Sequence, residues 1–456
     1  MTKKQKEKRI MLITYHFPPS LAVGGKRMTS FVKHLPAYRW KPFVLTLDEK
    51  HIENRDSEIA PELDHIKIIR TGLLPSMRGC YLFMKRKLNR KHSLENAENG
   101  TLRWESKRTK ISRKREGFGR KLKRHISSLL IALPDFERNW ILPAIDRALK
   151  EIKKEKIDVI LTSGPPHSVH IVGLVVSTMT NVHWTADFRD PWMTPFNKRF
   201  YPTSRLSNRV ERWLERKIFQ KADVILTTTE RLNDKFNAEY GDLSKAKIKF
   251  LPNGFDEDDF KELRSLNNYD IFTISYTGSI YFGRSPEPLF QAIQELIEEN
   301  KVSPDEIRVK LIGNCETIGP RLTMNVIASY GLDSVVEISG YIPYRKALKI
   351  TRQSHLALLL ASDQPYQIPA KVYDCMGTKT KILALTKKGA TADLINSTGI
   401  GKVIAPDDIE NIKDYLQYLF HNQKKTMERV EFSCNQYSRS ELVKDLALEL
   451  DHIVTS

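Results

Sequence analysis

The stretch "MLITYHFPPSLAVGGKRMTSFVKHL", residues 11–35, follows a basic N-terminal decapeptide and admits two interpretations. One is a secretory signal peptide, which needs an uninterrupted apolar core of about 7–15 residues. The apolar run here contains Tyr15 and His16 and stops at Pro18-Pro19. A buried strand, a turn with two glycines and an amphipathic helix fit the letters better. We therefore predict that these residues form the first strand and helix of an α/β domain and stay on the mature protein.

The composition indicates a folded, cytoplasmic protein. Its 456 residues allow two or three domains, and 40% of them are hydrophobic, enough for sizeable cores. No apolar run approaches the roughly 18 residues that a membrane span needs. The four cysteines, at positions 80, 315, 375 and 434, are far apart. Their spacing argues against a zinc site or a disulfide framework and fits a reducing compartment.

The net charge of +19 is concentrated in one segment, residues 85–124, which holds 16 Lys or Arg against four Glu. Such a segment can be a solvated insertion, or it can hold the protein peripherally on the anionic inner face of the cell membrane. Aromatic residues are sparse in it and no nucleic-acid-binding motif is visible. We therefore expect no nucleic acid as a partner and leave the other two interpretations open.

Short β-branched runs alternate with amphipathic helical patterns along most of the chain. This alternation is typical of parallel βαβ units. A charged, turn-rich linker at 256–268 separates an N-terminal domain at 1–255 from a second domain at 269–432. The predicted fold class is α/β, with two doubly wound parallel-sheet, Rossmann-like domains facing across a cleft. Ligands are expected in that cleft, beyond the carboxyl ends of the strands.

Two loops of the first domain are expected at this cleft. Gly24 and Gly25 precede a helix, where glycines allow close backbone approach and free N–H groups attract an anion. The stretch "SGPPHSVH" places His167 and His170 at another helix start, where an imidazole could orient a hydroxyl or act as a base. An ordinary turn and structural histidines are the alternatives.

A third loop of that domain, "ADFRDPW" at 186–192, follows another strand. Asp187, Arg189 and Asp190 can form a self-satisfied corner of salt bridges, because buried charges need partners. They can also recognise acceptor hydroxyls or the charge that develops in a reaction. The sequence leaves both possibilities open.

Two loops of the second domain suggest a site for a phosphorylated nucleotide. In "YQIPAKVYDCMGTKTKILAL", residues 366–385, Lys371 lies in the first turn of a helix and Asp374 follows three residues later. A cation at a helix N-terminus suits a diphosphate, and a carboxylate can accept two hydrogen bonds from a ribose diol. An ordinary capped helix with an ion pair is the alternative. The stretch "YTGSIYFGRSPEPL" adds Ser279 and Arg284 after the first strand of that domain.

Together these stretches resemble bacterial glycosyltransferases of family 4, and the resemblance covers most of the chain. The most specific features are "LPNGFD" at 251–256 and the helix that contains Lys371. The resemblance implies the GT-B architecture, a nucleotide-sugar donor, retention at the anomeric carbon, and no cofactor or bound metal. It also implies that the last helix, within 433–456, crosses back to the first domain.

The resemblance further implies roles for individual residues. Arg284, aided by Lys371, would neutralise the leaving diphosphate, and Asp374 would hold the donor ribose. The candidate donor-binding residues are Gly24, Gly25, Gly278, Ser279, Gly340, Ile342 and Asp374. The candidate catalytic residues are Arg284, Lys371, Asp187, Arg189, Asp190, His167 and His170.

The chain departs from the family pattern in its second domain. Tyr366 and Asp374 stand where the family usually has two glutamates, and Ser279 and Ser285 stand where an Arg and a Lys are usual. The predicted activity is transfer of a sugar to a glycan or lipid-linked acceptor in cell-surface polysaccharide biosynthesis. A nucleotide-sugar 2-epimerase on the same fold is one alternative. A degenerate, non-catalytic scaffold is another, and Tyr366 is the argument for it.

Overall fold

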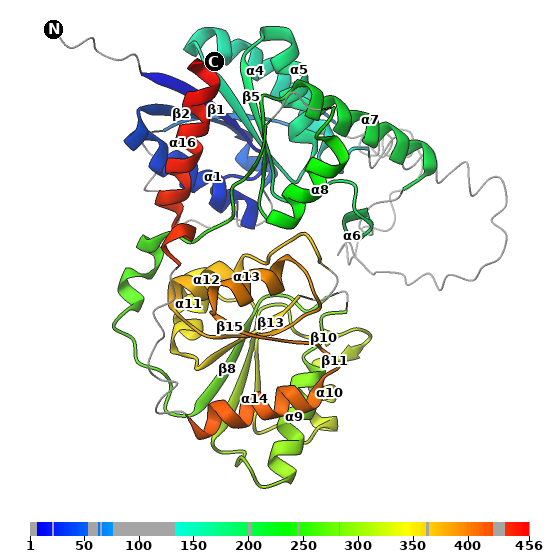
Figure 1. Ribbon diagram of the computed structural model, residues 1–456, viewed down its shortest axis with the longest axis vertical. Coiled ribbons are helices and arrows are strands. Elements are labelled where there is room, and N and C mark those ends of the chain that lie inside the picture. The colour runs from blue at the N-terminus through cyan, green and yellow to red at the C-terminus, as the bar shows by residue number, and fades with distance from the viewer. Residues whose placement is uncertain are drawn as a thin grey trace, which may run out of the picture.

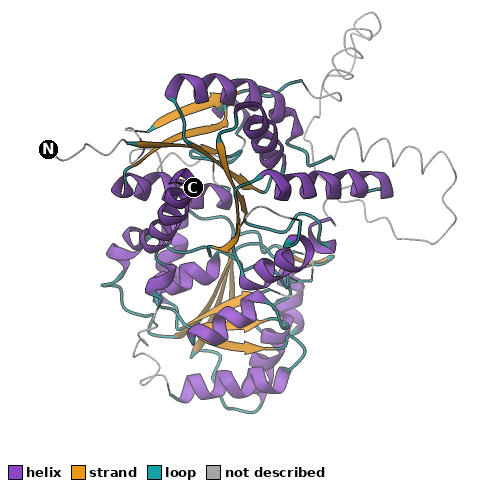
Figure 2. Ribbon diagram, turned by 45° about the horizontal axis from the view of Figure 1, so that its top comes forward, coloured by secondary structure: helices purple, strands orange, loops and turns teal. Residues whose placement is uncertain are grey.

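A computed structural model describes residues 7–20, 22–52, 63, 66–75, 133–198, 203–243, 247–281, 283–361, 364–422 and 434–455. The basic segment 85–124 lies outside these ranges. The described chain forms two parallel α/β domains, one above the other in Figure 1, with helices on both faces of each sheet in Figure 2. The predicted fold class is confirmed. None of the helices in these ranges has the length and hydrophobicity that a bilayer crossing requires.

The first domain is built on a parallel sheet whose described strands have the order β3-β2-β1-β4-β5-β6-β7. The strands are β1 (Lys8–Ile13), β2 (Trp40–Leu47), β3 (Lys67–Thr71), β4 (Val159–Gly164), β5 (His183–Phe188), β6 (Val224–Thr227) and β7 (Lys247–Phe250). Its helices include α1 (Val23–His34), α4 (Ile141–Glu155), α5 (Ser168–Thr180), α6 (Pro195–Lys198), α7 (Arg205–Lys221) and α8 (Glu230–Tyr240). β4 is buried along its whole length, because helices cover both faces, and its first half is the apolar run Val159–Leu161. The strand and helix predicted within residues 11–35 are confirmed as β1 and α1.

The second domain has a parallel sheet of order β12-β9-β8-β13-β14-β15 in the described chain. These strands are β8 (Phe272–Thr277), β9 (Ile307–Ile312), β12 (Val336–Ser339), β13 (Leu356–Leu360), β14 (Ile382–Leu385) and β15 (Gly401–Ile404). A hairpin of β10 (Thr317–Ile318) and β11 (Arg321–Leu322) lies beside it. The helices described here are α9 (Glu287–Glu298), α10 (Thr323–Ser329), α11 (Tyr344–Gln353), α12 (Lys371–Thr378), α13 (Ala390–Thr398) and α14 (Ile409–His421).

The final helix, α16 (Arg439–Thr455), packs against the first domain, and Figure 1 shows it running along that domain beside α1. Leu446 and Leu450 lie in one apolar cluster with Ile10 and Phe31. At the far end of α16, Asp451 accepts a 2.8 Å hydrogen bond from the indole of Trp40. The C-terminus therefore ties the second domain back to the first.

Candidate functional site

The carboxyl ends of the two sheets face each other, and the main cleft lies between them. The strand order reverses between β1 and β4 in the first sheet and between β8 and β13 in the second. Such switch points are where open parallel sheets bind ligands. The cleft has a volume of about 960 Å³, and a smaller cavity of about 380 Å³ adjoins it on the side of the first domain. Lys26, Asp190, Asp374 and Arg439 line both.

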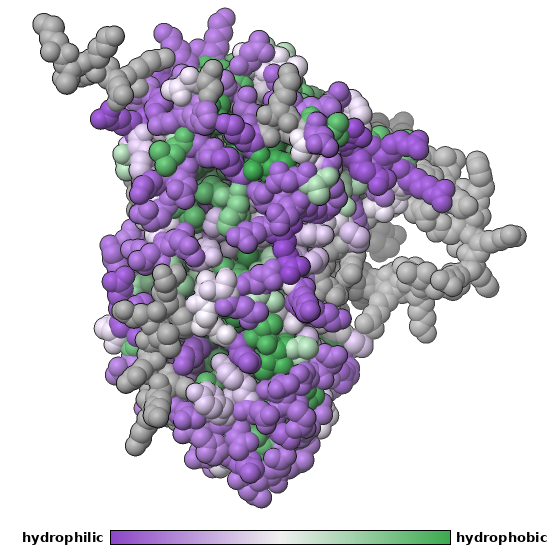
Figure 3. Space-filling model, in the orientation of Figure 1, coloured by the Kyte–Doolittle hydropathy of each residue, from purple (hydrophilic) through white to green (hydrophobic). Residues whose placement is uncertain are grey.

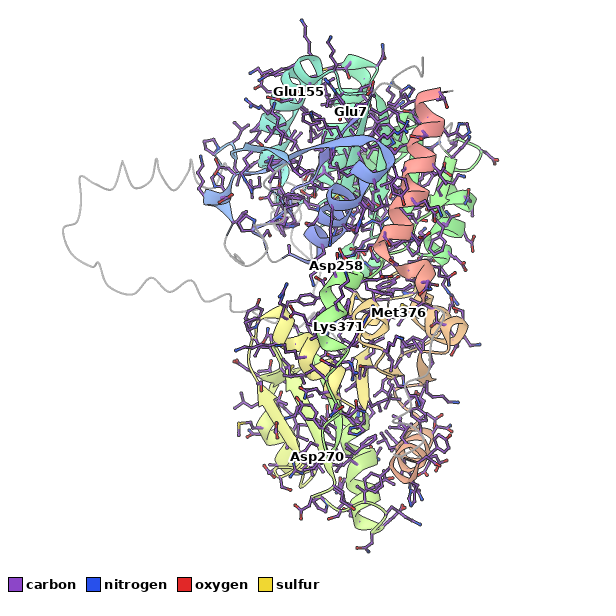
Figure 4. All side chains as sticks on the ribbon, turned by 90° about the vertical axis from the view of Figure 1, so that its left-hand side faces the viewer. Glu7, Glu155, Asp258, Asp270, Lys371 and Met376 are labelled. Carbon is purple, nitrogen blue, oxygen red and sulfur yellow. The ribbon has the colours of Figure 1, made fainter. Side chains whose placement is uncertain are left out.

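Lys371 is the first residue of α12 and lines the cleft. Its ammonium lies 4.3 Å from the centroid of the Tyr276 ring, and no ion pair joins it to another residue of the described chain. Gly278 has a φ of +137°, and a Cβ there would collide with the Lys371 ammonium. Burial, and then the positive charge of Arg284, lower the pKa of Lys371 to about 8. An unpaired, partly buried cation at a helix N-terminus is suited to an anionic ligand. Figure 4 shows Lys371 at the level where the two domains meet.

Arg284 lines the same cleft from the loop after β8. Its Nη2 donates a long hydrogen bond of 3.4 Å to the Gln364 side-chain carbonyl, and its guanidinium carbon lies 4.4 Å from the centroid of the Tyr281 ring. A guanidinium has five N–H donors, so this arrangement leaves others available to a ligand. The structure thus brings Arg284 and Lys371 to one wall of one cleft.

Asp374 lies one turn further along α12 than Lys371. One of its carboxylate oxygens accepts a 2.6 Å hydrogen bond from the Tyr344 hydroxyl. Ile342 also lines the cleft, whereas Gly340 and Ser279 are not among the lining residues. The structure therefore brings Asp374 and Ile342 to the predicted donor side, and the donor-binding roles of Gly340 and Ser279 stay predictions.

The N-terminus of α1 forms the facing wall. This helix has no side-chain cap and no acidic residue in its first turn. The Gly25 amide donates a 2.9 Å hydrogen bond to the Ala22 carbonyl, and the positive end of the helix dipole still favours an anion. Gly25 lines the main cleft and Gly24 lines the adjoining cavity. A Cβ on Gly24 would collide with the guanidinium of Arg189. A side chain at position 24 would therefore displace the Arg189 guanidinium from its present place.

Arg189 and Asp190 follow β5 and lie on the first-domain side of the site. Arg189 lines the smaller cavity and donates a short hydrogen bond to the Pro165 carbonyl, while its buried Nε has no hydrogen-bond partner. Burial lowers the pKa of Arg189 and raises the pKa of Asp190. These two side chains therefore line one cavity together with Asp374, and their catalytic roles stay predictions.

Asp187 lies behind this wall and lines neither cavity. Its carboxylate is fully buried and accepts hydrogen bonds from Arg27 at 3.1 and 3.0 Å and from the Ser163 hydroxyl at 2.7 Å. The expected corner of salt bridges among Asp187, Arg189 and Asp190 is therefore not formed: Asp187 pairs with Arg27 instead, because the Arg189 guanidinium points to the Pro165 carbonyl. The catalytic role of Asp187 stays a prediction, and its geometry is that of a structural ion pair.

His167 and His170 lie inside the first domain, outside both cavities. His170 is fully buried, 2.9 Å from the Thr162 hydroxyl, and stacks on Phe188 with ring centroids 4.3 Å apart. His167 stacks on Trp192. Burial lowers the pKa of His170 to about 3 and that of His167 well below its ordinary value of 6.5. The structure thus brings the two rings into one aromatic cluster, where both are neutral, and not to the donor-side residues.

Tyr366 makes a contact between the domains. Its backbone carbonyl accepts a 2.9 Å hydrogen bond from Thr229, and its ring packs against the core of the first domain. An ion pair between Arg231 and Asp393 joins the same two domains nearby. The side chain in the usual glutamate position therefore faces the other domain and does not line the cleft.

Sequence reasoning missed two basic residues that line both cavities. The Lys26 ammonium lies 2.9 Å from the centroid of the Tyr344 ring, so it bridges the domains. Its place directly after Gly25 could have identified it. Arg439 begins α16 and donates a 3.1 Å hydrogen bond to the Gly254 carbonyl. Nothing near it in the sequence resembles a site, because it reaches the cleft only through the return of α16.

No group of three or more His, Cys, Asp or Glu side chains in the described ranges is arranged to hold a metal ion. The acidic turn at the edge of the cleft is engaged by a lysine: the Lys33 ammonium lies 3.1 Å from Asp256 and 2.7 Å from Asp258. Figure 4 shows Asp258 on the connection between the domains. Metal independence stays a prediction.

The family model described as Glycosyltransferase Family 4 matches residues 110–259, a stretch that contains the loops after β4 and β5. The match covers 150 of the 456 residues and lies almost wholly within the first domain. The family resemblance stated from the sequence is thereby confirmed. No curated protein sequence matches the chain.

Solved structures of GT-B proteins resemble the whole chain at low sequence identity. A glycosyltransferase from Rickettsia africae has a TM-score of 0.59 at 14% identity, covering 99% of this chain and 100% of that one. The HepE protein of Anabaena, in complex with UDP-glucose, has a TM-score of 0.55 at 13% identity, covering 98% and 97%. UDP-GlcNAc 2-epimerase from Methanocaldococcus jannaschii has a TM-score of 0.50 at 11% identity, covering 97% and 99%. These likenesses establish the fold.

Proposed function

We propose that the protein is a retaining glycosyltransferase that moves a sugar from a nucleotide-sugar donor to a glycan or lipid-linked acceptor in cell-surface polysaccharide biosynthesis. One observation carries the proposal. The Lys371 ammonium, which has no ion-pair partner among the described residues, lies beside Gly278 and near Arg284, at a helix N-terminus, in a cleft of about 960 Å³. That volume is at the upper end of the range for small-molecule sites, about 300–1,000 Å³.

The donor lies against the second domain in this proposal. The diphosphate takes the charges of Lys371 and Arg284, the ribose diol donates to Asp374, and the base lies near Ile342. The HepE protein binds UDP-glucose on the same fold, so a uridine nucleotide is the first donor to test. The smaller cavity, with Arg189 and Asp190, takes the acceptor.

In the proposed reaction the bond between the anomeric carbon and the diphosphate oxygen breaks, and its electron pair leaves with the diphosphate. The acceptor hydroxyl attacks from the face that the diphosphate leaves, with no covalent enzyme intermediate, and its proton passes to the departing phosphate oxygen. Fixed cations beside the leaving group stabilise the negative charge that grows there. Lys371 and Arg284 fulfil that role without a metal.

The test uses Arg284→Ala in an assay that measures nucleotide release from the donor in the presence of acceptor. Removing one preorganised charge is expected to lower turnover by about 10²–10³-fold while the fold stays intact. Arg321→Ala is the matched control, because Arg321 is an exposed arginine of the same domain, paired with Glu287 outside the cleft. Near-normal turnover of Arg284→Ala would contradict the proposal.

A nucleotide-sugar 2-epimerase is the second candidate, favoured by the structural likeness to such an enzyme. The two activities differ in whether they need an acceptor. An epimerase releases an epimerised nucleotide sugar when no acceptor is present, whereas the proposed transferase needs an acceptor to release the nucleotide. Incubation with donor alone, followed by analysis of the sugar, distinguishes the two activities.

The proposed location of the protein is the cytoplasmic side of the cell membrane.

A further inference from the structure

Helix α7 carries a strongly basic outer face. Its 17 residues read RLSNRVERWLERKIFQK. The side chains exposed to solvent repeat every three or four positions, and they therefore form one stripe along the helix. The stripe consists of Arg205, Leu206, Arg209, Arg212, Trp213, Arg216, Lys217 and Gln220.

The charges of α7 are sorted by sign between its two faces. Both glutamates point inward: Glu211 pairs with Lys198, and Glu215 accepts a 2.6 Å hydrogen bond from the Tyr240 hydroxyl. The outward cations form no ion pair within the described chain, and Lys217 makes only a 3.3 Å contact with Gln220. No described acidic side chain therefore pairs with this positive charge. Figure 3 shows a strongly hydrophilic surface where the end of α7 stands clear of the domain.

Two large apolar side chains interrupt this stripe. Trp213 is 56% exposed and Leu206 is 48% exposed, and they lie seven residues, about two turns, apart on the same face. The other tryptophans in the described ranges are buried. An exposed Trp among arginines is the combination that meets the interface of an anionic bilayer, because the indole sits at headgroup level while the cations attract phosphates.

Helix α7 lies near the cleft, so a membrane bound by α7 would also be near the cleft. Figure 1 places α6 between α7 and the second domain. Asn197 of α6 lines the main cleft, and α7 begins only a few residues later. A flat surface touched by α7 would therefore lie close to the first-domain side of the cleft.

We propose that the outer face of α7 docks the protein onto anionic lipid headgroups, with Trp213 as the anchor. No residue of this surface belongs to the basic segment 85–124. Docking of α7 on a membrane would bring a lipid-linked acceptor close to the site, and this consequence rests on the proposed function. The docking itself does not rest on it. Charge complementarity and the exposed indole argue for a lipid surface over a nucleic acid.

The test measures sedimentation of the full-length protein with phosphatidylcholine vesicles that contain or lack phosphatidylglycerol. Wild type should bind the anionic vesicles only, and less at high salt. The triple variant Arg209→Glu, Arg212→Glu, Arg216→Glu should lose binding about a hundredfold or more, since each basic residue contributes roughly fivefold near such a surface. The control is Lys301→Glu, Lys349→Glu, Lys402→Glu, three exposed lysines of the second domain with the same change in net charge. It should keep most of the binding.

Trp213 provides a second readout. Anionic vesicles should shift tryptophan emission of the wild type to the blue, and Trp213→Phe should abolish the shift. Equal loss in both triple variants, no binding by the wild type, or binding to RNA with none to vesicles would overturn the inference. Thermal stabilisation by nucleotide sugars is measured on the same variants. If nucleotide sugars stabilise the wild type but it does not bind vesicles, only the docking inference is contradicted. If it binds vesicles but no nucleotide sugar stabilises it, only the proposed function is contradicted.

Discussion

Asp187 and His170 of the first domain differ from Lys371 and Arg284 of the second in the partners of their polar side chains, whereas Arg189 and Asp190 of the first domain line the cavities as Lys371 does. In the first domain, Asp187 is satisfied by Arg27, and His170 is held in an aromatic cluster. In the second, Lys371 has no ion-pair partner among the described residues, and Arg284 makes a long hydrogen bond to Gln364 and a contact with the Tyr281 ring. Residues with equally suggestive chemistry thus serve stability on one side and face the ligand space on the other.

The largest expected effect is that of Asp187→Ala, which tests whether Asp187 has a structural role. The substitution leaves the Arg27 guanidinium buried without its partner, which typically destabilises a protein by about 3–5 kcal/mol. Denaturant unfolding measures the loss. Asp146→Ala is the control, since it removes an exposed pair with Lys150 that is expected to contribute less than about 1 kcal/mol. Equal effects of both would contradict a structural role for Asp187.

Lys371→Met tests the opposite side. It removes the cation beside the leaving diphosphate, so turnover should fall by about 10²–10³-fold. The free energy of unfolding should rise or stay constant, because a partly buried charge is removed. Kinetic assays and denaturant unfolding on the same preparation give both numbers. If Lys371→Met lowered the free energy of unfolding and left turnover unchanged, Lys371 would have a structural role and not the proposed catalytic one.

The buried histidines predict how stability depends on pH. The pKa of His170 is about 3 in the folded protein against 6.5 ordinarily, so the unfolded chain binds the extra proton below pH 6.5. Stability should therefore fall as the pH drops from 6.5 towards 3, by about 2 kcal/mol at pH 5 for this one group. His170→Leu should remove that part of the slope, as measured by unfolding at pH 7 and pH 5. An unchanged slope would show that the ring is protonated in the folded state.

Ligand affinity should show the opposite pH dependence. The Lys371 amine, with a pKa of about 8, is charged below that pH and binds a diphosphate in that form. Affinity for a nucleoside diphosphate should fall as the pH rises through 8, by up to about tenfold per unit. Lys371→Arg keeps its charge and should flatten the profile. Identical profiles for wild type and Lys371→Arg would exclude this lysine as the titrating group.

The sequence predicted the two-sheet fold because β-branched runs and helical periodicity are local signals. It also predicted that Lys371 and Asp374 lie at the start of a helix facing the cleft, because Pro369 marks that helix start; both line the cleft, and their roles stay predictions. It could not show that His167 and His170 turn into the core, because the direction of a side chain at a helix start depends on packing. The sequence could not predict that Arg439 lines the cleft either, because this depends on how α16 packs against the first domain.

The most direct test of the central claim is calorimetric binding of UDP, GDP and ADP to wild type, Lys371→Met and Lys402→Met. The account predicts that one of these nucleotides binds the wild type and Lys402→Met equally, and that Lys371→Met loses about tenfold or more of the affinity. Binding by none of them, or equal binding by Lys371→Met, would contradict the placement of a donor diphosphate beside Gly278 and Lys371.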